Sequence, residues 1–168
     1  MILGMSIQTF TLLHVIISLV GIGTGLIAVF GLAGAKLLYR WTAVFLITTV
    51  LTSVTGFMFP FNGPTPGIVL GILSLIVLAL ACTALYAGKL SGAWRGAYVI
   101  TACLALYFNV FVLFAQLFAK VPALKALAPT PASPVFGATQ IVVLLAFTVL
   151  TIVAYRGFRV RAVVTSLS

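Results

Sequence analysis

The sequence predicts an all-α protein: a polytopic transmembrane helical bundle of five spans, forming a single domain over residues 1–168. The first observation behind this prediction is that 64% of the residues are hydrophobic and 5% are charged, whereas a soluble domain has about 25% charged residues. The second is a mean hydropathy of +1.37. The third is that the apolar residues form long continuous runs, not the ~10-residue alternating segments of a β-barrel. A membrane-embedded bundle of helices accounts for all three.

Five apolar runs are long enough to cross a bilayer, which takes about 20 residues in a helix. They cover about residues 8–31, 41–60, 67–87, 96–119 and 137–155. All seven prolines lie at the ends of these runs or between them, where helices are expected to stop. No basic residue precedes the first run, which is longer than the apolar core of a signal peptide, so we expect it to be retained as a helix.

The two connections on the side of the N-terminus differ in length. Residues 62–66 read NGPTP and predict a tight turn. The segment Lys120 to Pro134 is longer, and its middle, Pro122 to Ala128, predicts one or two helical turns lying on the membrane surface, with Pro at the favoured first position.

Charge sets the expected orientation. One side of a five-span bundle would carry seven basic residues: Lys36, Arg40, Lys89, Arg95, Arg156, Arg159 and Arg161. The other side would carry only Lys120 and Lys125. The positive-inside rule therefore predicts a periplasmic N-terminus and a cytoplasmic C-terminus.

The fourth run, from Gly96 to Lys120, contains two amides that lipid cannot satisfy. Asn109 and Gln116 are seven residues apart, so they share one helical face, which Ala102 and Ala105 continue. An unpaired amide in hydrocarbon costs several kcal/mol. We therefore expect this face to meet other helices and the run to lie at the centre of the bundle.

Small residues form two stripes at helical spacing, a pattern that allows close approach of backbones. They are Gly21, Gly25 and Ala28 in the first run, and Gly67, Gly71 and Ser74 in the third. The alternative is that glycine is simply common in membrane helices.

The candidate ligand-binding residues are His14, Asn109, Gln116 and Gln140, all placed by the topology in the outer half of the bundle. One interpretation is a single polar pocket, spanning the first, fourth and fifth runs, that binds a quinone, a pigment or a lipid headgroup. The other is hydrogen bonding between helices. His14, the only histidine, can also serve as a single axial ligand to a haem or a chlorophyll-type pigment.

Several chemistries are excluded. The chain has no Asp and no Glu, so a carboxylate proton relay, a Ser-His-acid triad and a carboxylate metal site are all impossible. Cys82 and Cys103 are too few to build a metal centre and are expected to be buried thiols. The net charge of +9 is scattered over the ends of the spans, which predicts contact with anionic lipid headgroups and not with nucleic acid. We therefore expect no resident cofactor and no enzymatic activity.

Three stretches resemble a group of small uncharacterised bacterial inner-membrane proteins with about five transmembrane helices. They are SVTGFMFPF at Ser53–Phe61, GILSL at Gly71–Leu75, and ALYFNVFVLFAQLFAKVPALKALAPT at Ala105–Thr130. The resemblance implies a multi-pass protein of the bacterial inner membrane and no established activity.

Two functions from different classes fit this sequence. The first is a non-catalytic accessory subunit of a larger bacterial membrane complex, for example a respiratory or photosynthetic one, with other integral membrane subunits as partners. The alternative is a stand-alone binder or transporter of a small lipophilic molecule, such as a quinone, lipid, pigment or haem.

Overall fold

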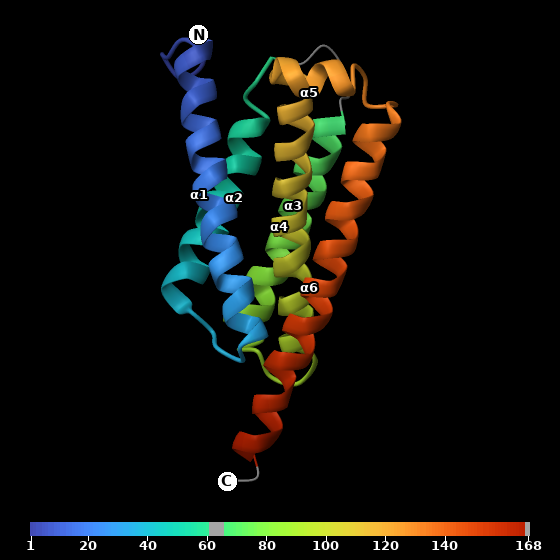
Figure 1. Cartoon of the computed structure of the whole chain (residues 1–168). Helices are drawn as coiled ribbons and strands as arrows, with labels where there is room; N and C mark the ends of the chain where they lie inside the picture. The colour runs from blue at the N-terminus through green and yellow to red at the C-terminus, as the bar shows by residue number, and fades with distance from the viewer. Residues whose placement is uncertain (61–65, 167–168) are drawn as a thin grey trace.

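The computed structural model describes residues 1–60 and 66–166, and in these residues the fold is built from helices packed side by side (Figure 1). The long helices are α1 (Ile7–Ala33), α2 (Tyr39–Gly56), α3 (Pro66–Cys82), α4 (Ala93–Lys120) and α6 (Pro134–Ser166). A short π-helix, η1 (Thr83–Ala87), continues α3, and a short helix, α5 (Pro122–Leu127), follows α4. The predicted all-α bundle is confirmed, whereas the predicted tight turn at 62–66 lies outside the described residues except for its last position.

Within the described ranges, four helices are long and apolar enough to cross a membrane: Ile7–Ala33, Gly67–Ala87, Ala93–Lys120 and Pro134–Phe158. The protein is therefore a multi-pass membrane protein by the character of its helices. Helix α2 has 18 residues, and they include Arg40 and six Thr or Ser side chains, which lower its hydropathy below that of the others.

The ends of the helices depart from the predicted spans in two places. Helix α2 ends at Gly56 and not at Pro60, and the amides of Phe57 and Met58 bond three residues back, to the carbonyls of Val54 and Thr55, in a tighter turn than that of an α-helix. The freed Phe59 packs edge-on against Phe10 and His14, with ring centroids 5.1 and 5.3 Å away. Helix α6 continues past residue 155 to Ser166, because a helix can extend beyond the apolar segment that hydropathy detects.

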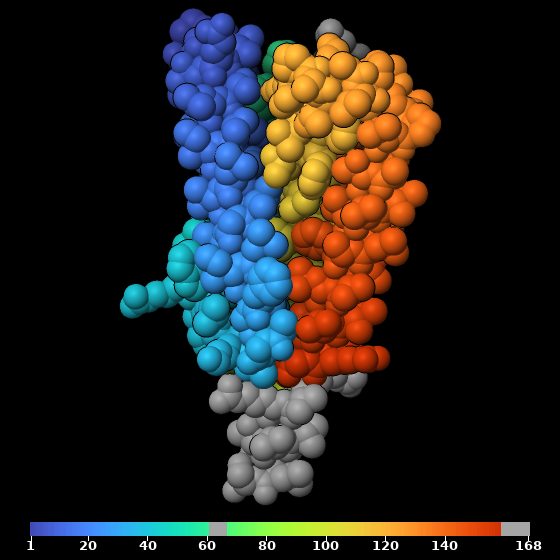
Figure 2. Space-filling model, viewed as in Figure 1, coloured from blue at the N-terminus to red at the C-terminus, as the bar shows by residue number. Residues whose placement is uncertain are grey.

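Helix α4 lies at the centre of the bundle, as predicted, and packs against α1, α2, α3 and α6. Ala102, Ala105 and Asn109 are buried on its inward face, whereas Gln116 is exposed. Figure 2 shows that α1 and α6 leave part of the surface of α4 visible between them, in the half of α4 nearest α5.

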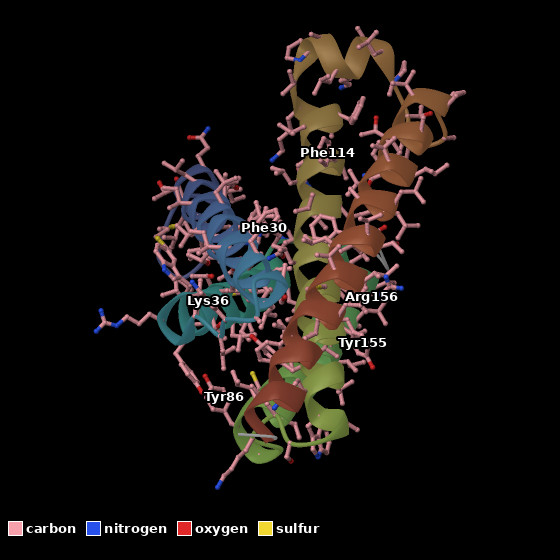
Figure 3. The ribbon with its side chains drawn as sticks, turned by 60° about the horizontal axis from the view of Figure 1, so that its bottom comes forward. Phe30, Lys36, Tyr86, Phe114, Tyr155 and Arg156 are labelled. Atoms are coloured by element: carbon pink, nitrogen blue, oxygen red, sulfur yellow. The ribbon has the colours of Figure 1, made fainter. Side chains whose placement is uncertain are left out.

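The two ends of the bundle differ in charge and structure. One end, called here the basic end, carries Lys36, Arg40, Lys89, Arg95 and Arg156. Lys36 and Arg156 are labelled in Figure 3. The opposite end carries α5, which lies across the bundle axis (Figure 1) and begins with Pro122 at its first turn. The predicted helix at 122–128 is thus confirmed to within one residue.

The small-residue stripe of α1 is a close packing surface. Gly21, Gly25 and Ala28 are all buried. A Cβ atom on Gly25 would lie 2.7 Å from both Leu106 Cδ1 and Phe45 Cδ2, so α1 can approach α2 and α4 only without a side chain there. The stripe of α3 is looser, since Gly67 is exposed and Gly71 is half-buried against Phe57.

Candidate functional site

The polar residues predicted to form a pocket are best described through their hydrogen bonds. His14 Nδ1 lies 2.8 Å from Thr55 Oγ1. The Thr55 hydroxyl donates its proton to the carbonyl oxygen of Leu51, 2.7 Å away. With the Thr55 proton used in this way, the tautomer that fits the contact has the proton on Nδ1, which donates to Thr55, and the lone pair on Nε2. This tautomer positions Nε2 as the only ring nitrogen able to act as an acceptor or a ligand.

Asn109 pairs with the same helix as His14. Its Nδ2 donates to Thr49 Oγ1 at 3.3 Å, and Thr49 is completely buried. Gly21 of α1 closes over this pair, because a Cβ atom there would be only 3.1 Å from Thr48 Oγ1 and 3.4 Å from Thr49 Oγ1. The amide is thus paired inside the bundle at the point where α1, α2 and α4 meet.

A third contact joins α2 to α3. Ser53 Oγ donates to Ser74 Oγ at 3.1 Å, and both side chains are buried. Nearer the basic end, the buried hydroxyls of Thr42 and Tyr98 lie close to each other, but neither forms a well-aligned hydrogen bond with the described residues.

Helix α2 therefore supplies one side-chain hydrogen bond to each of three neighbours: Thr55 to α1, Ser53 to α3 and Thr49 to α4. Sequence reasoning missed Thr49 and Ser53. The signal was present, because these residues and Thr42 recur at helical spacing on one face of a span that is otherwise apolar.

The remaining two candidates lie elsewhere. Gln140 of α6 is buried, and its Nε2 donates to the backbone carbonyl of Phe111 in α4 at 3.2 Å. Its Oε1 is buried without a hydrogen bond to any residue that the structure describes. Gln116 is exposed on α4. The predicted single cluster is thus divided: His14 and Asn109 bind α2, Gln140 binds α4, and Gln116 lies on the surface.

Two cavities in the structure are lined by other residues. One, of about 250 Å³, is a groove between α4 and α6. Its lining residues are Ile100, Cys103, Leu104, Tyr107, Leu144, Phe147, Thr148, Thr151 and Ile152. The other, of about 190 Å³, lies at the basic end. Both are smaller than the ~300–1,000 Å³ of pockets for drug-sized ligands.

No cluster of three or more His, Cys, Asp or Glu side chains occurs within residues 1–60 and 66–166, so these residues offer no multi-ligand metal centre. Cys82 and Cys103 are both free thiols, the second buried and the first half-buried. Single axial ligation of a haem or pigment through His14 Nε2 stays a prediction.

No protein-family model, no curated protein and no solved structure matches this chain. The resemblance to small bacterial inner-membrane proteins therefore stays a prediction, and function must be argued from the molecule itself.

The pairing of Asn109 with Thr49 gives a first quantitative prediction. Hydrogen bonds between membrane helices contribute about 0.6 kcal/mol on average and at most ~1.7. A double-mutant cycle of Asn109→Ala and Thr49→Ala, measured by unfolding in mixed detergent micelles, should give a coupling energy in this range. A coupling well above it would mean that the pair belongs to a larger polar network.

Proposed function

We propose that this chain is a non-catalytic subunit of a larger complex in the inner membrane of a bacterium, with five spans, a periplasmic N-terminus and a cytoplasmic C-terminus. Other integral membrane subunits and lipids are its partners. The polar side chains inside the bundle support a structural role, because His14, Asn109 and Gln140 are each engaged in hydrogen bonds between helices. Such bonds hold helices together and leave no set of groups converging on a substrate.

The distribution of apolar and hydroxyl-bearing residues around α2 supports its role as the fifth span. After its first three residues, its exposed side chains are Val44, Ile47, Leu51 and Val54, each at least 40% exposed. The hydroxyl-bearing residues Thr42, Thr49 and Ser53 are buried. A surface helix of a soluble protein has polar side chains on its outer face, whereas the outer face of α2 is apolar, and Phe45 and Leu46 are buried as well. An apolar outer face is stable against lipid tails, so α2 fits a bilayer in spite of its lower hydropathy.

The subunit proposal rests on the exposure of Gln116. Gln116 is exposed one turn before α4 ends at Lys120. The half of α4 nearest α5 is visible as a strip of surface between α1 and α6 (Figure 2). Lipid tails cannot form hydrogen bonds with an amide, whereas a helix of another subunit can. We therefore assign the surface around Gln116 as the contact surface for a partner helix that carries a polar side chain.

Substitutions at two exposed positions test whether this surface contacts a partner. Gln116→Trp should release the chain from its complex, because the bulky ring displaces the partner helix, and native gel electrophoresis of mildly solubilised membranes should then show the chain alone at 17.7 kDa plus detergent. Val149→Trp is the control, since Val149 is 61% exposed on α6. A wild-type chain that migrates alone, or two variants that migrate identically in a complex, would contradict the proposal.

The second candidate, a binder of a small lipophilic molecule, rests on the groove between α4 and α6. This groove is apolar except for a few polar groups, and Thr148 and Thr151 are bonded to their own helix. Tyr107 is the aromatic residue in its lining that also offers a hydroxyl. The absorption spectrum and the extracted small molecules of the purified chain test this candidate: a stoichiometric quinone, pigment or haem supports it, and a colourless, ligand-free chain counts against it.

A further inference from the structure

The basic end of the bundle holds a shallow cavity that no predicted site residue lines. It measures about 190 Å³ and is formed by Tyr39, Leu85, Tyr86, Lys89 and Leu90. Leu85 is buried, whereas Tyr39 and Tyr86 are 71% and 64% exposed. The cavity therefore lies between the buried Leu85 and three exposed residues, Tyr39, Tyr86 and Lys89, whose side chains carry two phenol groups and one ammonium group.

The turn that presents Lys89 has an unusual and well-supported backbone. It follows the π-helix η1, whose last bond runs from the Gly88 amide to the Thr83 carbonyl at 2.8 Å. Lys89 and Leu90 then adopt φ angles of +46° and +55°, in the left-handed region that L-residues rarely occupy. Such strain persists only where neighbouring groups impose it, and it is concentrated at functional sites.

Two contacts hold this turn in place. The Trp94 ring packs so closely on Gly88 that a side chain there would overlap it. The Leu90 amide donates to the Ala84 carbonyl at 3.1 Å. The backbone on one side of the cavity is therefore fixed before any ligand binds.

The charges around this turn have no Asp or Glu side chain of this chain to pair with. Arg95 is engaged locally, because its Nε donates weakly to the Leu90 carbonyl at 3.4 Å and its guanidinium lies 5.6 Å from the centre of the Phe158 ring. Lys89 is exposed at the rim of the cavity. The chain contains nine Lys and Arg residues and no carboxylate side chain, so no internal ion pair with Asp or Glu can neutralise Lys89.

We propose that this cavity binds the phosphate group of one anionic phospholipid in the membrane leaflet at the basic end. The ammonium of Lys89 supplies the charge, and the hydroxyls of Tyr39 and Tyr86 supply hydrogen-bond donors. The cavity is too small for a whole organic ligand of drug size. A phospholipid needs to place only its headgroup there, because its acyl chains stay in the bilayer. Farther along the bundle, the exposed residues Ile47 of α2 and Leu80 of α3 offer an apolar surface to the acyl chains. This inference does not depend on whether the chain is a subunit of a complex.

Native mass spectrometry of the full chain in mild detergent tests the proposal, with phosphatidylglycerol and phosphatidylcholine of identical acyl chains as probes. The wild-type chain should bind phosphatidylglycerol more tightly. Lys89→Gln should weaken that binding about fivefold, the effect of one basic residue near an anionic lipid surface. Lys125→Gln, an exposed lysine of α5 at the opposite end, is the matched control and should leave the affinity unchanged.

Tyr86→Phe keeps the ring and removes the hydroxyl, so it should also weaken binding of phosphatidylglycerol while the melting temperature stays at the wild-type value. Three results would overturn the proposal. Equal affinity for both lipids would remove the need for an anionic headgroup. Equal losses of affinity for phosphatidylglycerol in Lys89→Gln and Lys125→Gln would indicate a general attraction of the anionic lipid to positive charge. Displacement of phosphatidylglycerol by millimolar inorganic phosphate would identify a site for free anions.

Discussion

Replacing Gly157 by Ala is expected to cost about 3 kcal/mol of stability, near the upper part of the usual range for overpacking. Gly157 of α6 lies directly on the end of α1, and an added Cβ atom would overlap the carbonyl oxygen of Ala33. A clash with a side chain can be relieved by a new rotamer, whereas a clash with backbone forces one helix to move. The contact between α1 and α6 at the basic end should therefore open.

Unfolding of the purified variant in mixed micelles, followed by circular dichroism, measures this loss. Gly137→Ala is the matched control on the same helix, because a Cβ atom at Gly137 meets no atom within 4 Å. That variant should gain roughly 0.5–1 kcal/mol, the usual advantage of Ala over Gly in a helix. Equal stability of the two variants would show that α1 and α6 are not in contact in the membrane protein.

Replacing Gly25 by Leu should have a still larger effect, above about 3 kcal/mol, and should prevent normal assembly of the bundle. The first added atom would already lie 2.7 Å from Leu106 Cδ1 and 2.7 Å from Phe45 Cδ2. Both neighbours are completely buried, so neither can swing out of the way. The three further side-chain carbons of Leu have no space at all between α1, α2 and α4.

Gly23→Leu provides the comparison two residues away. Gly23 is exposed and an added Cβ atom there meets nothing within 4 Å, so a leucine would extend into lipid. We expect this variant to be produced and to melt like the wild type. If Gly23→Leu and Gly25→Leu reduce folded yield equally, the small-residue stripe is not a packing surface.

The sequence predicted the helices well because apolar runs and prolines carry that information directly. The central position of α4 could also be predicted, because the amide of Asn109 needs a hydrogen-bond partner and is therefore expected to be buried against other helices. The short helix α5 was predicted from a proline at its first turn. These features depend on the types of neighbouring residues and on whether the surroundings are lipid or water, and both can be inferred from the sequence.

The arrangement of the polar residues could not be predicted in the same way. Asn109 and Gln116 share a helical face, yet one is buried and the other is exposed, because burial depends on where α1 lies over that face. Similarly, His14 pairs with Thr55 of α2 and not with Gln140, which contacts α4 instead. Helical periodicity fixes the direction of a side chain on its own helix, but it does not identify the neighbour that it meets.

The buried hydroxyls and the apolar outer face of α2 have a consequence for how the protein enters the membrane. A helix with an arginine at its start and six Thr or Ser side chains gains little from partitioning into lipid alone. Several of its hydroxyls bond carbonyls of α2 itself, but their side-chain partners His14, Ser74 and Asn109 lie on α1, α3 and α4. Two of those helices are synthesised after α2. If α2 is the fifth span, as proposed, its stable integration into the membrane should be delayed until α4 has emerged from the ribosome. Insertion of the bundle would then be cooperative across helices.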